Sequence, residues 1–198
     1  CPLTNNYDVK QYVELIKLTD AANSDLYIHG EGSLTYQGSN MYFFNSAITV
    51  NGGKLCVDGT TIRGSNGYHT GYCYGINALY GNVVIQGGAN IIGEVYSGDG
   101  VCALSVGEEG LNKSLSVSIW DGKFYVDRDV EDGNHDHGIW VNNDCGLRIY
   151  GGAFDGIDKI IEKGLSIEYN INTKGSNSVK IMNIHKSKGL EFSLCYFV

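Results

Sequence analysis

The chain has 198 residues, of which 42% are hydrophobic and 18% charged, and its formal net charge is −8. This composition excludes a disordered tail and is typical of one domain with a buried core. The negative charge argues against nucleic acid as a partner, because an acidic surface repels a phosphate backbone. No apolar run approaches the roughly 18 residues of a membrane-spanning helix, so we expect no membrane span.

The first residue is Cys1 and not methionine, and we expect no signal peptide in the opening residues. Two interpretations stay open. Cys1 is either the lipidated residue of a mature lipoprotein or an arbitrary boundary in a longer chain.

The first segment, residues 1–24, allows two structures. Val9, Tyr12, Val13 and Ile16 have a helical spacing, which favours an N-terminal helical cap. Read as a strand, Tyr12 to Leu18 forms instead a first coil, ahead of the repeating part of the chain.

Residues 25–165 contain one short pattern that recurs: an apolar residue, any residue, Ile or Val, and then a glycine turn. Self-similarity of this kind is the signature of a solenoid. The five copies begin at Leu26, Ile48, Val83, Val117 and Leu147. Their central residues, at positions 28, 50, 85, 119 and 149, are separated by 22, 35, 34 and 30 residues.

Each copy is followed by a second short strand. The later copies are also preceded by another short strand. Alternation predicts that the residues after the turns also point inward, at Leu34, Leu55, Phe124 and Phe154. The preceding strands include 74–78, 100–103 and 138–141. A lone coil cannot bury such a face, but stacked coils turn equivalent residues into internal ladders.

These features predict an all-β fold, a right-handed parallel β-helix forming a single domain over residues 1–198. An antiparallel sandwich also has many short strands, but it does not require one motif to return in one register. In residues 166–198 we expect C-terminal coils, with closing strands at 178–184 and 189–194.

The repeated motifs resemble those of a known class of β-helix. Residues 30–35, 74–78, 83–88 and 147–154 resemble the repeats known as carbohydrate-binding domains in exported surface proteins of gut Firmicutes, and more broadly the pectin-lyase-like β-helices. The resemblance covers roughly residues 25 to 165. It implies a secreted or cell-surface bacterial protein that binds sugar, and it brings no catalytic signature onto any residue of this chain.

If the apolar ladders face inward, the residues between them form two outward columns. Amide, imidazole, guanidinium and aromatic groups in such columns suit a glycan, because rings stack on sugar C–H surfaces and polar groups bind hydroxyls. The alternative is that these positions are the ordinary polar surface of a solenoid. The candidate carbohydrate-binding residues are His29, Asn51, Gln86, Trp120 and Tyr150, with Tyr27 and Arg148.

A second candidate site is the acidic segment from Asp127 to His137. Clustered carboxylates bind Ca²⁺ through hard oxygens, although the bidentate glutamate of an EF-hand is missing here. The alternative is a solvated loop. Apart from this candidate Ca²⁺, we expect no cofactor, and the candidate ligands are Asp127, Asp129, Asp132 and Asp136.

The six cysteines show no CxxC pair and no other metal-ligand spacing. Two of them, Cys56 and Cys102, lie in strand-like stretches, where a thiol acts as a small packing residue. We therefore expect mostly free cysteines rather than three disulfides.

The sequence thus predicts a non-catalytic surface module that binds a polysaccharide or a cell-surface glycan along an outward sheet face. Two alternatives stay open. One is a passive spacer or adhesin segment with a protein partner. The other is a small polysaccharide lyase or hydrolase that uses the acidic segment 127–137.

Overall fold

The computed structural model describes residues 12–20, 24–38, 44–66, 72–95, 100–108, 114–128, 136–142 and 146–154. All regular structure in these ranges is β-strand. None of the residues described belongs to a helix able to cross a bilayer. The strands are β1 (Tyr12–Thr19), β2 (Asp25–His29), β3 (Ser33–Gly38), β4 (Phe44–Asp58), β5 (Thr61–Asn66), β6 (Tyr72–Gln86), β7 (Asn90–Val95), β8 (Gly100–Val106), β9 (Leu115–Ile119), β10 (Lys123–Arg128), β11 (Asp136–Val141), β12 (Gly146–Ile149) and β13 (Ala153–Phe154).

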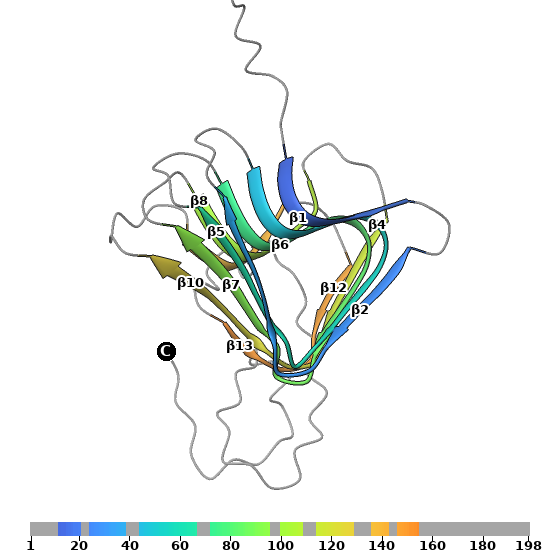
Figure 1. Cartoon of the computed structure of the whole chain (residues 1–198). Helices are drawn as coiled ribbons and strands as arrows, with labels where there is room; N and C mark the ends of the chain where they lie inside the picture. The colour runs from blue at the N-terminus through green and yellow to red at the C-terminus, as the bar shows by residue number, and fades with distance from the viewer. Residues whose placement is uncertain are drawn as a thin grey trace, which may run out of the picture.

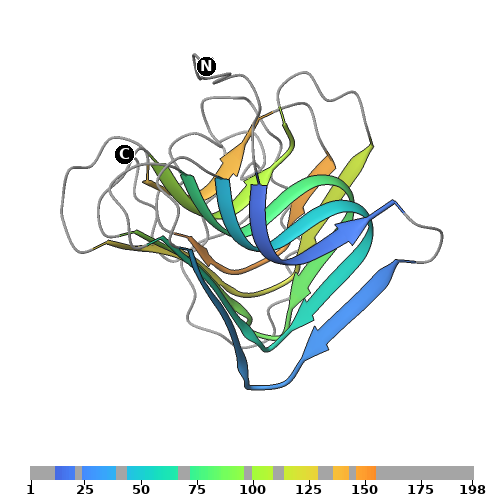
Figure 2. The ribbon, with the colours of Figure 1, turned by 45° about the horizontal axis from the view of Figure 1, so that its top comes forward.

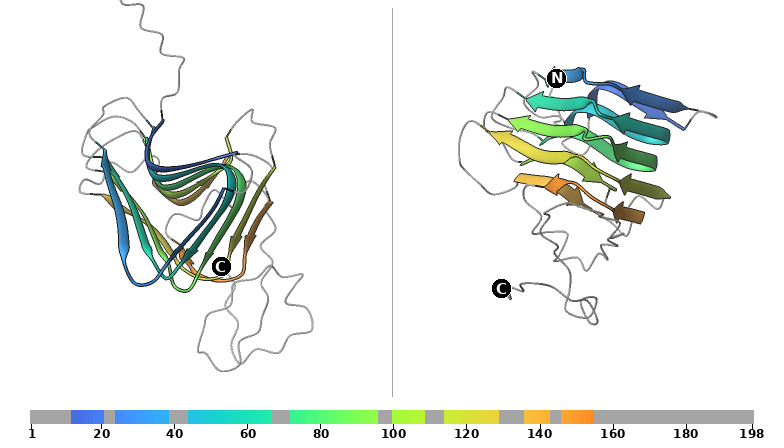
Figure 3. Two further views of the ribbon diagram at one scale, coloured as in Figure 1. Left: turned by 45° about the vertical axis from the view of Figure 1, so that its right-hand side comes forward. Right: turned by 90° about the horizontal axis from the view of Figure 1, so that it is seen from below.

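Parallel pairing arranges these strands in three faces around one core (Figure 1). The first face holds β1, the first halves of β4 and β6, β8 and β11. The second holds β2, the second halves of β4 and β6, β9 and β12. The third holds β3, β5, β7, β10 and β13. One passage through the three faces is a coil, and the coils stack in layers (Figure 3). The predicted parallel β-helix is confirmed.

The core consists of apolar ladders, because each inward residue lies beside its equivalent in the next coil. In register, the ladders of the three faces are Ile16–Ile48–Ile76–Leu104–Ile139, Ile28–Val57–Ile85–Ile119–Ile149 and Leu34–Ile62–Ile91–Phe124–Phe154. The residues of the middle coils are fully buried, and Phe124 stacks on Phe154 with ring centroids 5.1 Å apart.

The corner between the second and third faces is built from glycines with positive φ. Gly59 has φ 72° and Gly87 has φ 67°, a conformation that costs glycine little and other residues much. Thr60, the buried residue that follows Gly59, donates its hydroxyl to the Gly30 carbonyl at 2.8 Å. The corner thereby joins successive coils through a side chain as well as through the backbone.

The passage from the first face to the second is a bend, not a tight corner. In β4 and β6 the strand continues through this bend (Figure 2). In the next coil β8 and β9 are separate strands. Ala78 pairs with Val106, and Gly81 pairs with Leu115. The two residues are three positions apart in β6, whereas their partners are nine positions apart, so the later coil holds six extra residues here.

The repeat differs from the predicted one in the second coil. Ile48 and Val50 belong to the first face, where they pair with Ile76 and Ala78. The residue equivalent to Ile28 is Val57, so the true separations along 28, 57, 85, 119 and 149 are 29, 28, 34 and 30 residues. Leu55 likewise belongs to the second face. The inward position after the corner, which was predicted for Leu55, is occupied by Ile62, the partner of Leu34.

The predicted helical cap is wrong for residues 12–19, which form β1 in register with β4. The strand interpretation, a first coil beginning at Tyr12, is the one found. Ile16 and Leu18 alternate with Lys17 and pair with the first-face ladder, which a helix cannot do. The rest of the cap segment and the expected C-terminal coils, residues 166–198, lie outside the described residues.

Candidate functional site

The outer surface of the second face carries two columns of side chains, one residue per coil. One column runs Tyr27, Cys56, Val84, Ser118, Arg148. The other begins with His29, Asp58 and Gln86, which are paired in register. It continues beyond the last pairs with Trp120, whose backbone N–H donates to the Ile85 carbonyl, and Tyr150, whose backbone N–H donates to the Ile119 carbonyl. We call the second column and Tyr27 the polar–aromatic strip.

One predicted member, Asn51, does not belong to this strip. It pairs with Tyr80 at the bend between the first and second faces and is half-buried. The missed residue is Asp58, which lies in register between His29 and Gln86. The stretch Leu55-Cys-Val-Asp-Gly59 has the repeated pattern and would have identified it.

Asp58 is the centre of a hydrogen-bonded group that spans three coils. The Tyr27 hydroxyl and the Gln86 amide Nε2 both donate to Asp58 Oδ2 at 2.9 Å. The carboxylate also lies close over Gly87, since a Cβ at that position would be 2.0 Å from Asp58 Oδ1. The hydrogen bonds from Gln86 and Tyr27, with the nearby His29, hold the pKa of Asp58 below its usual range. The bond to Asp58 raises the pKa of Tyr27 in turn.

We expect the pKa of Asp58 to rise toward its ordinary value of 3.8 in Tyr27→Phe, because a donor to the charged form is lost. A carboxyl whose pKa is lowered in the folded state stabilises the fold at pH values above the pKa that it has in the unfolded chain. That contribution is lost as the pH falls from 3.8 through the lowered value. A carboxyl NMR titration measures the shift, with Tyr72→Phe as a control on another face. An unchanged Asp58 pKa in Tyr27→Phe would contradict the assignment.

Trp120 and Tyr150 form the aromatic end of the strip. Their rings stack with centroids 4.1 Å apart and planes 12° from parallel. Although Tyr150 covers one face of the indole, Trp120 remains 51% exposed. About half of the residue's surface therefore stays open to solvent in spite of the stack. Gln86, in the preceding coil, turns its amide toward Asp58.

The two remaining predicted residues lie toward opposite ends of the second face. His29 is exposed and stacks on Tyr27, with ring centroids 5.2 Å apart. Arg148 is exposed in the last coil, two residues before Tyr150, and forms no ion pair with another described residue. The structure therefore places six of the seven predicted residues on one face and separates only Asn51 from them.

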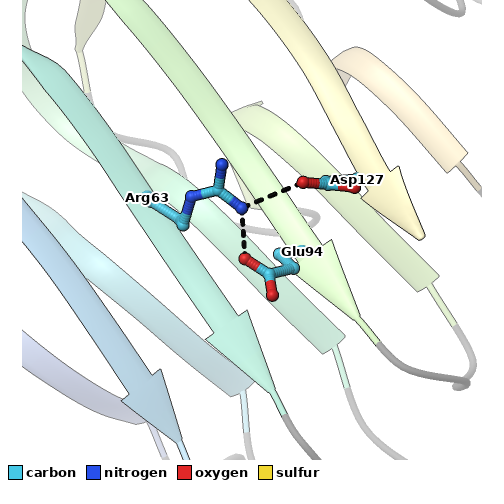
Figure 4. A network of polar contacts seen from close by, with 3 residues as sticks. All are labelled: Arg63, Glu94 and Asp127. Carbon is cyan, nitrogen blue, oxygen red and sulfur yellow. Dashed lines mark hydrogen bonds and ion pairs between the residues drawn. The ribbon is translucent and has the colours of Figure 1, made fainter. Parts of the chain in front are cut away.

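Two of the four metal candidates, Asp129 and Asp132, lie outside the described residues, while Asp136 begins β11. Asp127 lies on the outer surface of the third face. There Arg63 Nη1 contacts both Glu94 Oε2 and Asp127 Oδ2, the latter at 3.0 Å (Figure 4). A cation at Asp127 would meet a carboxylate that already accepts a hydrogen bond from this guanidinium. The part of the chain that the structure describes contains no group of three potential metal ligands.

Three cysteines lie in the described ranges, and all three are free, as expected. Burial raises the pKa of Cys73 to about 12 and raises that of Cys102 well above its usual range. Cys56 is half-buried on the second face, and its pKa is also raised, first by burial and then by Asp58.

We expect alkylation of the native protein to modify Cys56 slowly and to leave Cys73 and Cys102 unmodified, because the thiolate is the reacting form. Peptide-resolved mass spectrometry distinguishes the sites. The same reaction in guanidinium chloride, where all three must react, is the control. Rapid labelling of Cys73 in the native protein would show that its burial is wrongly assigned.

No protein-family model, curated protein or solved structure matches this chain.

Proposed function

We propose that the protein is a non-catalytic module that binds a polysaccharide along the polar–aromatic strip. The observation that carries the proposal is Trp120, which is stacked on Tyr150 at 4.1 Å and still 51% exposed. An indole that is stacked on one face and still half-exposed suits the C–H surface of a sugar ring, because stacking restricts its side chain before binding.

The neighbouring polar group supports the same ligand class. Asp58 is held in place by Tyr27 and Gln86, so its carboxylate presents fixed acceptors within the strip. Coils in a parallel sheet are about 4.8 Å apart, and five coils extend the strip over roughly 19 Å. That length accommodates several sugar units of an extended chain. The motifs that resemble carbohydrate-binding β-helix repeats accord with this ligand and with a secreted or cell-surface protein.

The test is a glycan-array screen of the protein, made once with Ca²⁺ and once with EDTA. The release of reducing ends from the same polysaccharides is measured alongside. We expect retention of at least one polysaccharide and no release. Trp120→Ala should weaken binding at least tenfold, because truncation of an aromatic side chain that carries much of the binding energy costs about 1.4 kcal/mol or more. It should lower the free energy of unfolding by about 1 kcal/mol through the lost stack with Tyr150.

Tyr72→Ala is the matched control, because Tyr72 is 41% exposed but lies on the first face. It should leave binding unchanged. Binding that survives Trp120→Ala would exclude the strip as the site. Silence of the folded protein across the array would favour a spacer or adhesin segment, and release of reducing ends would favour an enzyme.

A further inference from the structure

The second face carries two exposed aromatic side chains that lie in different coils of the polar–aromatic strip. Tyr27, in the first coil, is 56% exposed, and Trp120, in the fourth coil, is 51% exposed. They are the large exposed apolar side chains of this face among the residues that the structure describes. Three coil spacings separate them, which is roughly 14 Å. A polysaccharide that contacts both rings therefore lies along the solenoid axis and crosses the coils between them.

Asp58 lies on that path, in the coil that follows Tyr27. Its Oδ2 accepts hydrogen bonds from Tyr27 and Gln86, and these bonds hold the pKa of the carboxyl below its usual range. The side chain is therefore charged at neutral pH and cannot turn away without breaking both bonds. It is only partly buried, so the carboxylate accepts further hydrogen bonds from a ligand, but it cannot donate one.

Two further acids flank the strip where the second face turns into the third. Glu31 and Asp121 lie in this corner, between β2 and β3 and between β9 and β10, and both side chains are exposed. They add negative charge along the same path, on a chain whose formal net charge is −8.

The basic side chains of the second face do not cancel the charge of Asp58. Lys54 is in register with Asp25, so the charges of these two residues offset each other. Arg148 lies in the fifth coil, three coils from Asp58. At that separation, roughly 14 Å, physiological salt screens most of the interaction between two exposed charges. The middle of the strip is therefore acidic.

We propose that the strip binds uncharged polysaccharides and discriminates against acidic ones, an inference that rests on the proposed function. A carboxylate or sulfate on a sugar that crosses the second coil would lie beside Asp58. Two like charges roughly 4 Å apart in water weaken binding about fivefold. A hydroxyl group in the same place donates a hydrogen bond to the carboxylate instead.

The test compares chemically matched polysaccharides on the array. Xyloglucan, galactomannan, starch and mixed-linkage glucan are each tested before and after oxidation of their C6 hydroxymethyl groups to carboxylates. Polygalacturonate is compared with its methyl ester in the same way. The screen is run at about pH 7.5, so that histidine contributes little positive charge. We expect each retained polysaccharide to bind at least about fivefold more tightly in its neutral form, and the ratio to fall as salt is added.

Asp58→Asn tests whether this one carboxylate sets the preference. Since Tyr27 and Gln86 donate to the same oxygen of Asp58, the amide oxygen of asparagine can accept both bonds. We expect the ratio of neutral to acidic affinity to fall toward one. Asp127→Asn is the matched control, because it makes the same change in net charge on the third face and should leave the ratio unchanged. Circular dichroism checks that both variants fold.

Equal binding of the two forms by the wild-type protein, or tighter binding of the acidic form, would overturn the inference. So would a ratio that Asp58→Asn leaves unchanged, or that Asp127→Asn lowers as much, since net charge and not the strip would then set it. These results leave the proposed function standing as long as Trp120→Ala still weakens retention. Silence on every polysaccharide, or binding that does not depend on Trp120, removes the proposed function and this inference with it.

Discussion

Replacing Phe124 with alanine is expected to lower the free energy of unfolding by about 3–5 kcal/mol, the usual cost of removing a buried phenylalanine. Phe124 is completely buried in the third-face ladder between Ile91 and Phe154. Its truncation leaves a void that the coils on either side cannot fill without shifting the strands. It also removes the ring stack with Phe154, whose centroid lies 5.1 Å away.

Chemical denaturation measures this loss, which is a large share of the roughly 5–15 kcal/mol that holds most domains folded. Tyr125→Ala is the matched control, since Tyr125 is the next residue of β10, points outward and is half-exposed. It should cost about 1 kcal/mol or less. Equal losses in the two variants would contradict the assignment of inward and outward positions in this strand.

Gly64→Ala is expected to destabilise the protein by at least about 3 kcal/mol, at the upper end of the usual cost of overpacking. A Cβ on Gly64 would lie 1.9 Å from the Tyr74 carbonyl oxygen and 3.2 Å from the Ala47 nitrogen. Both are backbone atoms of the first face, so neither can rotate away. The third face would have to move from the first where the two approach each other closely.

Gly32→Ala provides the comparison, because a Cβ there meets nothing within 4 Å and the backbone lies outside the left-handed region. It should be neutral or stabilise the protein by about 0.4–1 kcal/mol through the unfolded chain. Denaturation curves of the two variants distinguish a close backbone approach from a general need for glycine. A neutral Gly64→Ala would show that the faces are further apart than the structure places them.

The class of fold was predictable because the inward ladders repeat, and the error in the second coil has a physical cause. Ile48-Thr-Val-Asn-Gly-Gly53 reproduces the strand-and-turn pattern, but its glycines form the bend between the first two faces. The bend and the corner both require glycine, so composition alone does not distinguish them. The unequal spacing of 22 and then 35 residues was the available signal, since replacing Val50 with Val57 makes the separations 29 and 28.

The candidate site was predictable as a column but not as a set of contacts. Outward alternation identified His29, Gln86, Trp120 and Tyr150. It did not indicate that Gln86 turns toward Asp58, or that Tyr27 reaches into the next coil. Those choices depend on rotamers and on the space over Gly87, which a sequence pattern does not contain.

The narrow range of offsets between paired strands has a consequence for how the chain acquires its structure. Each parallel pair joins residues 28 to 35 positions apart, from β1 with β4 to β10 with β13. No pairing joins distant parts of the described chain, so two neighbouring coils form a nucleus without waiting for the rest. Growth then proceeds in either direction by adding one coil at a time. We expect unfolding to follow the reverse path, with the outermost described coils separating first and the coils around Ile76 and Ile85 last.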